Sequence, residues 1–479
     1  MRLNIEQITR ISGAKLVQQA ATPAVPLTQL TWDSRAVQPG SLFLALQGER
    51  HNGNDYLIPA LDAGAAGVLA SRLTTAAERA HAAAKGAAIL EVANAQQALE
   101  NLACGQRSLL GARVIGLTGS SGKTTTKDLV AAVAAQGFNT VATAGNHNNE
   151  LGVPATILRA DPDTQVLITE MGMRGIGQIA ALCAIALPRI GIITNIGVAH
   201  LELLGSRENI ARAKAELIEA LPDNTGIAIL NGDDPFTPFI RQVADTQGRS
   251  IAVYSYGLGR QNDLRAHNIS YNDQGQARFD LCMPNASQTP VALALQGEHN
   301  VYNALAAATA GWVLGLDTPA IVQALQQAQG APMRQETIIT ATGVQIINDT
   351  YNANPDSMRA ALALLGRLSP ERPHIAVLGD MLELGADELE QHYALGQLAA
   401  QSGLALLLTV GQRARLIAQG ARDGGMSAAS VVQCADVAQA LHVLDPHSLS
   451  LLAQKPVVLV KASRSLELER VVQGVDEKC

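Results

Sequence analysis

The sequence predicts an α/β protein of three domains, each built around a sheet. Short apolar segments rich in β-branched residues alternate with segments of helical spacing along most of the 479 residues. A glycine-rich loop at residues 118–126 stands between one such apolar segment and a helical one. A chain of this length corresponds to roughly two to four domains of about 100 to 200 residues each.

Residues 1–100 predict a small mixed α/β N-terminal domain. Strands are expected at 41–46 and 66–70, where apolar residues run together between turns. An alanine-rich helix follows these strands. The alternation of strands, turns and a helix favours a mixed unit.

Residues 101–328 predict a central domain that contains the glycine-rich loop. Apolar strands are expected at four places, with helical segments between them: 113–117, 166–169, 190–194 and 226–230. This rhythm is typical of a mostly parallel sheet with helices on both faces.

Residues 329–479 predict a C-terminal, Rossmann-like α/β domain. The run Gln329-Gly330-Ala331-Pro332 breaks the preceding helical pattern. Strands separated by helices are expected at 344–347, 375–378, 405–410 and 457–460. Ligand sites are common between domains, so we expect the functional site near this junction.

Composition limits the partners that the chain can have. A net charge of −7 argues against nonspecific binding of nucleic acid or of acidic membranes. Five scattered cysteines in no metal-binding spacing suit reduced thiols. No signal peptide or apolar run of about 18 residues is visible, so we expect a soluble cytoplasmic protein without membrane insertion.

The loop at 118–126 predicts a nucleotide phosphate site, because a strand precedes it and a helix follows it. Glycines allow close backbone approach, helix-start amides face the anion, Lys123 adds positive charge and Thr124 can ligate Mg²⁺. Leu117 stands where the consensus loop has glycine. The alternative is a structural loop without nucleotide. The residues expected to contact ATP or GTP are Gly119, Ser120, Ser121, Gly122, Lys123, Thr124 and Thr125.

Polar side chains at two strand ends of the central domain predict a metal site. Glu170 closes the strand at 166–169, and His200 follows the strand at 190–194. A carboxylate beside a phosphate loop is well placed for Mg²⁺. A solvated glutamate and a packed histidine are the structural alternatives. Lys214 lies on a helical stretch and, taken alone, is typical of a surface lysine.

Further polar positions are ambiguous by themselves. Asn300 and Asn303, one helical turn apart, could contact an adenine edge or cap their helix. Asp349 could hold ribose hydroxyls. Asn352 and Asn354 could bind substrate or form a plain turn. The run Lys461-Ala462-Ser463-Arg464 is similarly ambiguous.

Three runs accompany the phosphate loop: GNHNNELGVP at 145–154, YNANP at 351–355 and LGDMLELG at 378–385. In this order, the loop and the runs resemble the Mur ligases, the ATP-dependent amide-forming enzymes of bacterial peptidoglycan synthesis. The family's phosphate loop has the shortened form TGxxGKTT, which accounts for Leu117. The resemblance spans all three domains.

The resemblance implies ATP and Mg²⁺ as cofactors. It implies that Lys123 and Thr124 contact the phosphates and Mg²⁺, and that Glu170 and His200 belong to the metal shell. Lys214 matches a lysine that many members carry carbamylated, a form that could hold a second Mg²⁺. Asn300 and Asn303 are placed near adenine. Arg334 and Asp349 are placed at the ATP phosphates and ribose after closure of the third domain.

The resemblance also implies two substrates, UDP-N-acetylmuramoyl-tripeptide and D-alanyl-D-alanine, and a monomer is expected. Family members commonly read DGH and KGSR where this chain has Asn52-Gly53-Asn54 and Lys461-Ala462-Ser463-Arg464. The residues implied at the uridine diphosphate end are Ser34, Arg35, His51, Asn52 and Gly53. Asn148 and Asn149 are also implied in substrate binding. Those implied at the dipeptide are Asn352, Asn354, Lys461, Ser463 and Arg464.

Other functions compete with this one. A ligase that adds lysine or diaminopimelate, or a folylpolyglutamate synthase, would share the chemistry but is expected to carry different third-domain loops. A P-loop GTPase or kinase fits the phosphate loop alone, although a GTPase should show NKxD, which is absent from the sequence. A scaffold protein is the remaining class.

Overall fold

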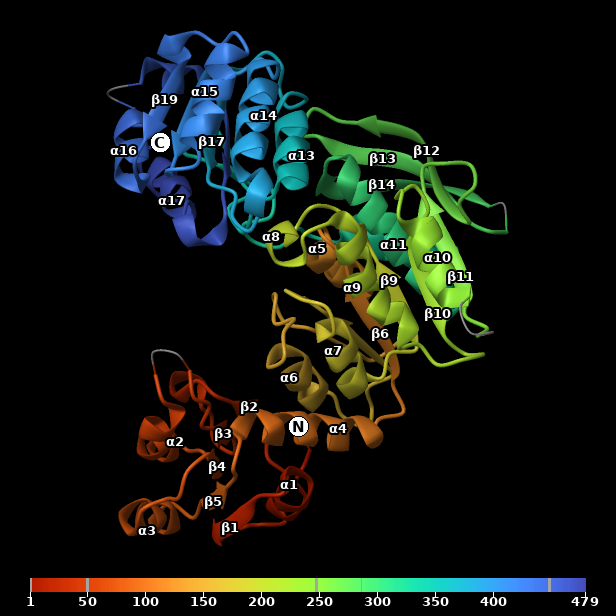
Figure 1. Ribbon diagram of the computed structural model, residues 1–479, viewed down its shortest axis with the longest axis vertical. Helices are drawn as coiled ribbons and strands as arrows, with labels where there is room; N and C mark the ends of the chain where they lie inside the picture. Colours follow the sequence, from red (N-terminus) through yellow and green to blue (C-terminus); the bar gives the residue numbers. More distant parts are fainter. Residues whose placement is uncertain (1, 49–50, 246–248, 286, 447–448) are drawn as a thin grey trace.

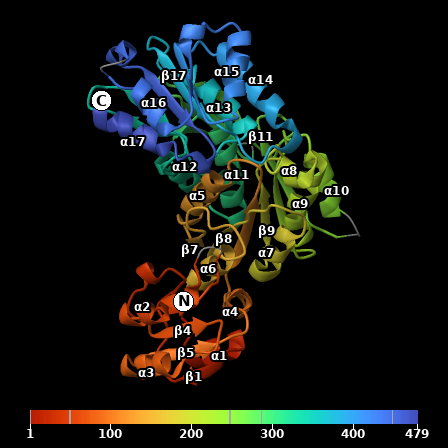
Figure 2. The same cartoon turned by 60° about the vertical axis from the view of Figure 1, so that its left-hand side comes forward.

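Three sheet-containing units follow one another along the chain in this computed structural model. It describes residues 2–48, 51–245, 249–285, 287–446 and 449–479. Figures 1 and 2 show the first unit at one end of an elongated molecule, the central unit in the middle and the third at the other end.

The first unit contains a five-stranded sheet in the order β1-β5-β4-β3-β2. Neighbours are parallel except β1 and β5, which confirms a mixed α/β domain. Its strands are β1 (Lys15–Gln18), β2 (Leu30–Thr31), β3 (Leu42–Leu44), β4 (Gly67–Ala70) and β5 (Ala88–Glu91). Its helices are α1 (Ile5–Ser12), η1 (Ser34–Ala36), η2 (Gly53–Tyr56), α2 (Leu57–Asp62) and α3 (Ala76–Ala84).

Helix α4 (Ala95–Ser108) joins the first unit to the central one. It packs against α1 on one side and against α6 (Gly152–Arg159) and α7 (Gln178–Ala186) on the other. The buried amide of Gln106 donates to the carbonyl of Ala160 at 2.7 Å. The predicted boundary at residue 100 therefore falls inside a continuous helix.

The central unit contains a nine-stranded sheet in the order β14-β13-β12-β11-β10-β9-β6-β8-β7. Seven neighbouring strands, from β7 to β12, pair in parallel as predicted. These strands are β6 (Arg113–Thr118), β7 (Thr140–Ala142), β8 (Val166–Glu170), β9 (Ile190–Ile193), β10 (Ile227–Asn231), β11 (Ala252–Gly257) and β12 (Leu264–Tyr271).

Helices cover both faces of this sheet, and a hydrophobic core lies on each face. Helices α5, α11 and α12 pack together, and α7 packs on α9. The helices after α4, besides α6 and α7, are α5 (Lys123–Ala134), α8 (Leu201–Leu204), α9 (Arg207–Glu219), α10 (Thr237–Asp245), α11 (Glu298–Leu314) and α12 (Thr318–Gln327).

An antiparallel arm at 264–296 was not among the predicted strands. Strand β12 pairs antiparallel with β13 (Gln276–Cys282), which pairs antiparallel with β14 (Gln288–Gln296). Only one face of the arm is buried, so its strands alternate apolar and polar residues. Figure 1 shows the arm reaching toward α13 of the third unit.

The third unit contains a six-stranded sheet in the order β15-β16-β20-β17-β18-β19, parallel except for β15 with β16. A core on each face confirms the Rossmann-like prediction. Its strands are β15 (Glu336–Ile339), β16 (Gln345–Asn348), β17 (His374–Gly379), β18 (Leu406–Val410), β19 (Val431–Cys434) and β20 (Val457–Lys461). Its helices are α13 (Pro355–Leu365), η4 (Gly385–Asp387), α14 (Glu388–Ala400), α15 (Arg415–Asp423), η5 (Ala428–Ser430), α16 (Val437–Val443), η6 (Ser450–Gln454), η7 (Arg464–Leu466) and α17 (Glu469–Lys478).

The central and third units touch beyond the linker that joins them. The guanidinium of Arg367 lies 4.8 Å from the ring centre of Tyr271 in β12. The amide of Glu202 donates to the carbonyl of Glu383 at 3.4 Å. Among the described helices, none is long and apolar enough to cross a membrane.

Candidate active site

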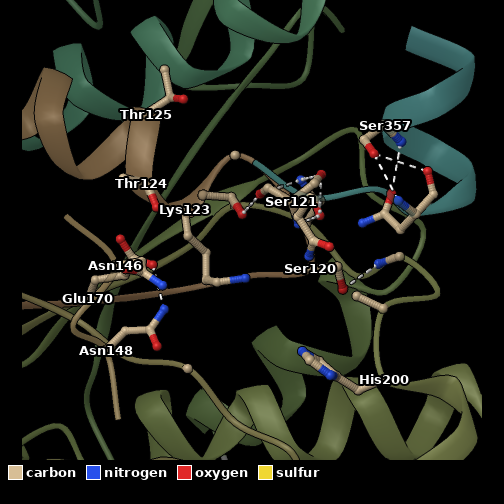
Figure 3. Close-up of a pocket in the computed structure, with 18 of the residues that line it drawn as sticks. Ser120, Ser121, Lys123, Thr124, Thr125, Asn146, Asn148, Glu170, His200 and Ser357 are labelled. Atoms are coloured by element: carbon tan, nitrogen blue, oxygen red, sulfur yellow. Dashed lines mark hydrogen bonds between the residues drawn. The ribbon is translucent and has the colours of Figure 1, made fainter. Parts of the chain in front are cut away.

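A cleft of about 1740 Å³ lies where the carboxyl ends of the central and third sheets face each other. Figure 3 shows residues of the phosphate loop, Asn148, Glu170 and His200 around one cavity. The predicted residues that line it are Ser120, Ser121, Gly122, Lys123, Thr124, Thr125, Asn148, Asn149, Glu170, His200, Asn300, Asn303, Arg334, Asp349, Asn352, Asn354, Lys461, Ser463 and Arg464. Gly119, Lys214 and the first-domain residues do not line it.

The phosphate loop turns from β6 into α5 as predicted. Gly122 is the residue before the helix and has φ 74°, a left-handed conformation that glycine adopts without strain. A Cβ there would lie 2.6 Å from Oδ1 of Asn303. The amide of Ser121 donates to Oδ1 of Asn195 at 3.0 Å, which ties the loop to the end of β9. The loop is therefore held from two sides.

Lys123 extends over this loop, where Nζ donates to the carbonyl of Gly119 at 2.8 Å. Burial lowers the pKa of the Lys123 ammonium; nearby Glu170 opposes the shift and Arg334 adds to it. The loop thus combines a partly desolvated cation with helix-start amides, an arrangement suited to phosphate oxygens.

Glu170 combines deep burial with an unused oxygen. The side chain is on a residue only 1% exposed, and Oε1 accepts a hydrogen bond from Nδ2 of Asn148 at 2.7 Å. Oε2 is also buried but has no hydrogen-bond partner among the described residues. A buried carboxylate oxygen without a donor fits a bound cation. Within the described chain, no group of three or more His, Cys, Asp or Glu side chains is arranged to hold a metal.

His200 points across the domain junction. It has φ 65° at the start of α8, and Nδ1 lies 2.6 Å from Oε2 of Glu383 in the third unit. This contact lowers the pKa of the Glu383 carboxyl. Sequence reasoning did not single out Glu383, although it lies in the LGDMLELG run.

Lys214 is buried, at 1% exposure, so the interpretation as a surface lysine is wrong. It lies on the face of α9 that packs into the core. It makes no hydrogen bond or ion pair with any described residue. Burial and the charge of Lys123 hold its pKa well below the usual value. Its charged form is therefore disfavoured in the folded chain.

Asn300 and Asn303 are buried and do not cap α11, whose N-cap is Gly297. Asn303 accepts from Oγ1 of Thr126 at 3.0 Å and donates to Oδ1 of Asn300 at 2.8 Å. These bonds fasten α11 to α5. Nearby His299, which the sequence did not indicate, contacts Oε1 of Gln335 at 2.9 Å through Nε2.

Arg334 joins the third unit to the phosphate loop. One guanidinium nitrogen donates to Oγ1 of Thr124 at 3.0 Å, and the group stacks 3.8 Å from the ring centre of Tyr351. A cation from the third unit therefore reaches a residue of the phosphate loop across the cleft.

The other predicted third-domain residues are bonded within the third unit. Nζ of Lys461 lies 2.7 Å from Oδ2 of Asp349 and donates to the carbonyl of Asn352 at 2.9 Å. Ser463 accepts from the amide of Leu382 at 3.0 Å. Arg464 pairs with Glu469 at 2.5 Å. Asn354 caps α13.

The first-domain residues lie after the carboxyl ends of β2 and β3, outside the cleft. Asp33 binds the guanidinium of Arg35 through both oxygens, at 2.9 and 2.8 Å. A Cβ on Gly53 would lie 2.7 Å from the amide nitrogen of Leu46, so this turn requires glycine. Ser34 begins η1, His51 contacts Tyr56 at 3.5 Å, and Asn52 caps η2.

Comparison with known proteins was consistent along the whole chain. Residues 26–107 match the Mur ligase family catalytic domain, residues 117–311 the Mur ligase middle domain, and residues 333–464 the Mur ligase glutamate ligase domain. A curated relative from Mycobacterium leprae is 39% identical over 97% of this chain and 96% of its own length. It is named UDP-N-acetylmuramoyl-tripeptide–D-alanyl-D-alanine ligase.

Two solved structures share the complete architecture. One is the UDP-N-acetylmuramoylalanyl-D-glutamyl-2,6-diaminopimelate–D-alanyl-D-alanyl ligase of Acinetobacter baumannii, with TM-score 0.83, 32% identity and coverage of 100% of this chain and 99% of that chain. The other is MurF ligase from Thermotoga maritima in complex with ADP, with TM-score 0.77, 27% identity and coverage of 94% and 97%. The chain belongs to the Mur ligase family and, within it, to the MurF group.

Proposed function

We propose that this chain is the ATP-dependent ligase that joins D-alanyl-D-alanine to UDP-N-acetylmuramoyl-tripeptide in peptidoglycan synthesis. The observation that carries the proposal is the cleft, in which a phosphate loop and a buried glutamate face third-domain loops. Relatives that match over the full length carry this activity in their names. The products are UDP-N-acetylmuramoyl-pentapeptide, ADP and phosphate.

The reaction has two steps. The terminal carboxylate of the tripeptide attacks the γ-phosphorus of ATP, which forms an acyl phosphate and releases ADP. The amine of D-alanyl-D-alanine then attacks the acyl carbon; phosphate leaves and the amine loses a proton. Because carboxylate and ATP are both negative, Lys123 and the helix-start amides screen their repulsion and stabilise the phosphoryl transfer.

Glu170 and Thr124 are our proposed Mg²⁺ ligands, supported by the unpaired Oε2 of Glu170. A bound Mg²⁺ supplies charge neutralisation at the phosphates. Asn148 orients Glu170 by holding its other oxygen. His200 and a carbamylated Lys214 complete the proposed metal shell. The buried, unpartnered amine of Lys214 supports the carbamate, and the contact of His200 with Glu383 places His200 at the domain junction.

The remaining nucleotide contacts are proposed from position. Asn300 and Asn303 line the cleft beside the phosphate loop and are our adenine candidates. Arg334 and Asp349 lie opposite them and are the candidates for the phosphates and the ribose. Closure of the third domain would exclude water from the acyl phosphate.

Substrate contacts are assigned by domain. The proposed domains are residues 1–100, 101–328 and 329–479. Ser34, Arg35, His51, Asn52 and Gly53 are proposed for the uridine diphosphate end. Asn148 and Asn149 are proposed for the peptide. The proposed dipeptide site consists of Asn352, Asn354, Lys461, Ser463 and Arg464. Because Lys461 and Arg464 are already paired, dipeptide binding there requires exchange of an ion pair.

We further propose a cytoplasmic monomer. The five cysteines are all free, as is typical of a reducing compartment.

Phosphate release tests the function directly. The protein is incubated with ATP, Mg²⁺ and UDP-N-acetylmuramoyl-tripeptide, with or without D-alanyl-D-alanine. We expect release only when the dipeptide and the tripeptide are both present. Release that is equal with lysine or diaminopimelate in place of the dipeptide would contradict the assignment.

A further inference from the structure

Seven cationic side chains line the cleft, apart from histidines, and six are bonded to the protein itself. Lys123 and Arg207 donate to backbone carbonyls, and Arg334 donates to Thr124. The other three are in ion pairs: Arg359 with Asp356, Lys461 with Asp349, and Arg464 with Glu469.

Arg174 is the exception. Its side chain is exposed in the cleft and makes no hydrogen bond or ion pair with any residue that the structure describes. The charge of Arg174 helps to lower the pKa of the nearby Glu383 carboxyl, but the direct partner of that carboxylate is His200, at 2.6 Å. The guanidinium of Arg174 is therefore available to a ligand.

The backbone that carries Arg174 is held in place. The amide of Arg174 donates to Oε1 of Gln178 at 2.6 Å, and the amide of Gly172 donates to the carbonyl of Asn148 at 2.8 Å. Gly177, which precedes α7, donates to the buried carboxylate of Glu216 at 2.5 Å. A free guanidinium on a fixed backbone is suited to recognition, because only the side chain, and not the loop, must be ordered on binding.

Arg174 also lies on the path that the substrate must follow. It comes four residues after Glu170 and lines the cleft together with Leu182 and Ile185 of α7 and Glu100 of α4, two helices that pack against each other. This side of the cleft leads from the phosphate loop toward the first domain, where the uridine diphosphate end is proposed. The peptide of the substrate would have to lie along it.

The peptide carries anions besides its reacting group. The name of the A. baumannii ligase specifies an alanyl-D-glutamyl-2,6-diaminopimelate peptide. Glutamate and diaminopimelate are both dicarboxylic acids, so each leaves one carboxylate free after the peptide bond or the new amide is made. Arginine binds carboxylates through two parallel hydrogen bonds, which fixes both position and orientation.

We propose that Arg174 binds a carboxylate of UDP-N-acetylmuramoyl-tripeptide other than the one that is phosphorylated. This inference rests on the proposed function and adds a residue that selects the peptide. Arg174 anchors the peptide on the central domain, so that its terminal carboxylate reaches the γ-phosphate above Lys123.

The test compares Arg174→Gln and Arg174→Lys with Arg212→Gln, which removes an exposed arginine of α9 outside the cleft. We expect Arg174→Gln to raise the KM for the tripeptide substrate about 10- to 100-fold, the size of a lost charged hydrogen bond. The KM values for ATP and for the dipeptide should be unchanged. Arg174→Lys should restore part of the loss, and Arg212→Gln should match the wild type.

Two tripeptide substrates identify the carboxylate. Lysine in place of diaminopimelate removes the free carboxylate of the third residue and leaves that of the glutamyl residue. If Arg174→Gln raises the KM only for the diaminopimelate substrate, Arg174 binds the carboxylate of the third residue. If it raises the KM equally for both substrates, Arg174 binds the carboxylate of the glutamyl residue. An unchanged tripeptide KM, or a raised KM for the dipeptide alone, would overturn the proposal.

Calorimetric binding separates this inference from the function itself. Binding of UDP-N-acetylmuramoyl-tripeptide is measured without ATP, so it needs no turnover. Weaker binding by Arg174→Gln than by Arg212→Gln supports the inference even if no ligation occurs. Equal binding by the two variants contradicts it, even if the wild type is an active ligase.

Discussion

The two halves of the cleft differ in whether their charged side chains have partners within the protein. In the central half, Oε2 of Glu170 has no hydrogen-bond partner among the described residues, and the side chain of Arg174 makes no hydrogen bond or ion pair with them. Lys214, which does not line the cleft, also has no such partner. In the third-domain half, the lining charges are paired, as in Lys461 with Asp349. The central half therefore keeps some charged groups without a partner, whereas the charged side chains of the third-domain half are bonded within the protein.

This difference assigns the halves different roles. A buried charge without a partner is costly, so the unpaired oxygen of Glu170 is suited to a cation, whereas the exposed guanidinium of Arg174 is free to bind an anion. An internal ion pair instead fixes the shape of a loop. We infer that the central half binds the phosphates and the metal. The third-domain half then covers the bound nucleotide with loops whose shape is fixed by internal ion pairs. Two contacts join the halves: Arg334 donates to Thr124, and Glu383 contacts His200.

The largest expected effect is on stability, in the third-domain half. The side chains of Lys461 and Asp349 are 3% and 12% exposed. Lys461→Met would leave a nearly buried carboxylate without its cation and should lower the stability of the third domain by about 3 to 5 kcal/mol. Urea unfolding measures the change. The double variant Lys461→Met with Asp349→Leu should recover part of the lost stability. An unchanged urea midpoint for Lys461→Met would contradict the proposed difference between the halves.

Lys123→Met should act in the opposite way, on activity and not on stability. Losing one donor to the transferring phosphoryl group should lower kcat about 100- to 1000-fold. The melting temperature should not fall, because burial disfavours the charged form of Lys123 in the folded chain and lowers its pKa. The matched control is Lys15→Met, on the exposed surface of β1. A variant with full activity would contradict the assignment of the phosphate loop.

The third prediction concerns Lys214→Ala, which removes a buried amine that has no partner among the described residues. We expect activity to fall about 10- to 100-fold, as for a residue that supports a metal. Short-chain carboxylic acids should restore part of the activity by taking the place of the carbamate. Phosphate release with and without these acids measures both effects. Unaltered activity would exclude the carbamate.

The smallest effect concerns the first domain, which pairs its charges as the third does. Arg72 lies 2.5 Å from Glu78, and their hydrogen bond lowers the pKa of Glu78 from 4.5 to about 2. The stabilisation is therefore complete above pH 4.5 and is lost as the pH falls toward 2. Melting temperatures across this window should fall less steeply for Glu78→Gln. If the melting temperatures of the wild type and Glu78→Gln fall in parallel as the pH is lowered, the Arg72–Glu78 pair does not contribute to stability.

The elements predicted correctly have local signals. The phosphate loop follows from a strand, glycines and a helix within residues 113–133. The parallel strands are buried on both faces and are therefore continuous apolar runs, such as β17 and β18. The antiparallel arm at 264–296 escaped prediction because alternation of polar and apolar residues on a half-exposed sheet is a weaker signal.

Other features depend on contacts between distant segments. The burial of Lys214 follows from how α9 packs on the sheet, and alanines around a lysine are equally compatible with a surface helix. Glu383 contacts His200 only because the third domain lies against α8. Arg174 is recognisable as a free cation only after the partners of the other six are known.

By itself, the sequence determined the three α/β units, the phosphate loop and the resemblance to Mur ligases, because each depends on neighbours in the chain. The tertiary structure decided which charges are paired. Some pairs are local, such as Arg359 with Asp356, but Lys461 with Asp349 and Arg334 with Thr124 depend on the packing of segments more than 100 residues apart. Charge type is written in the sequence, but the partner of each charge and its exposure to water exist only in the folded chain.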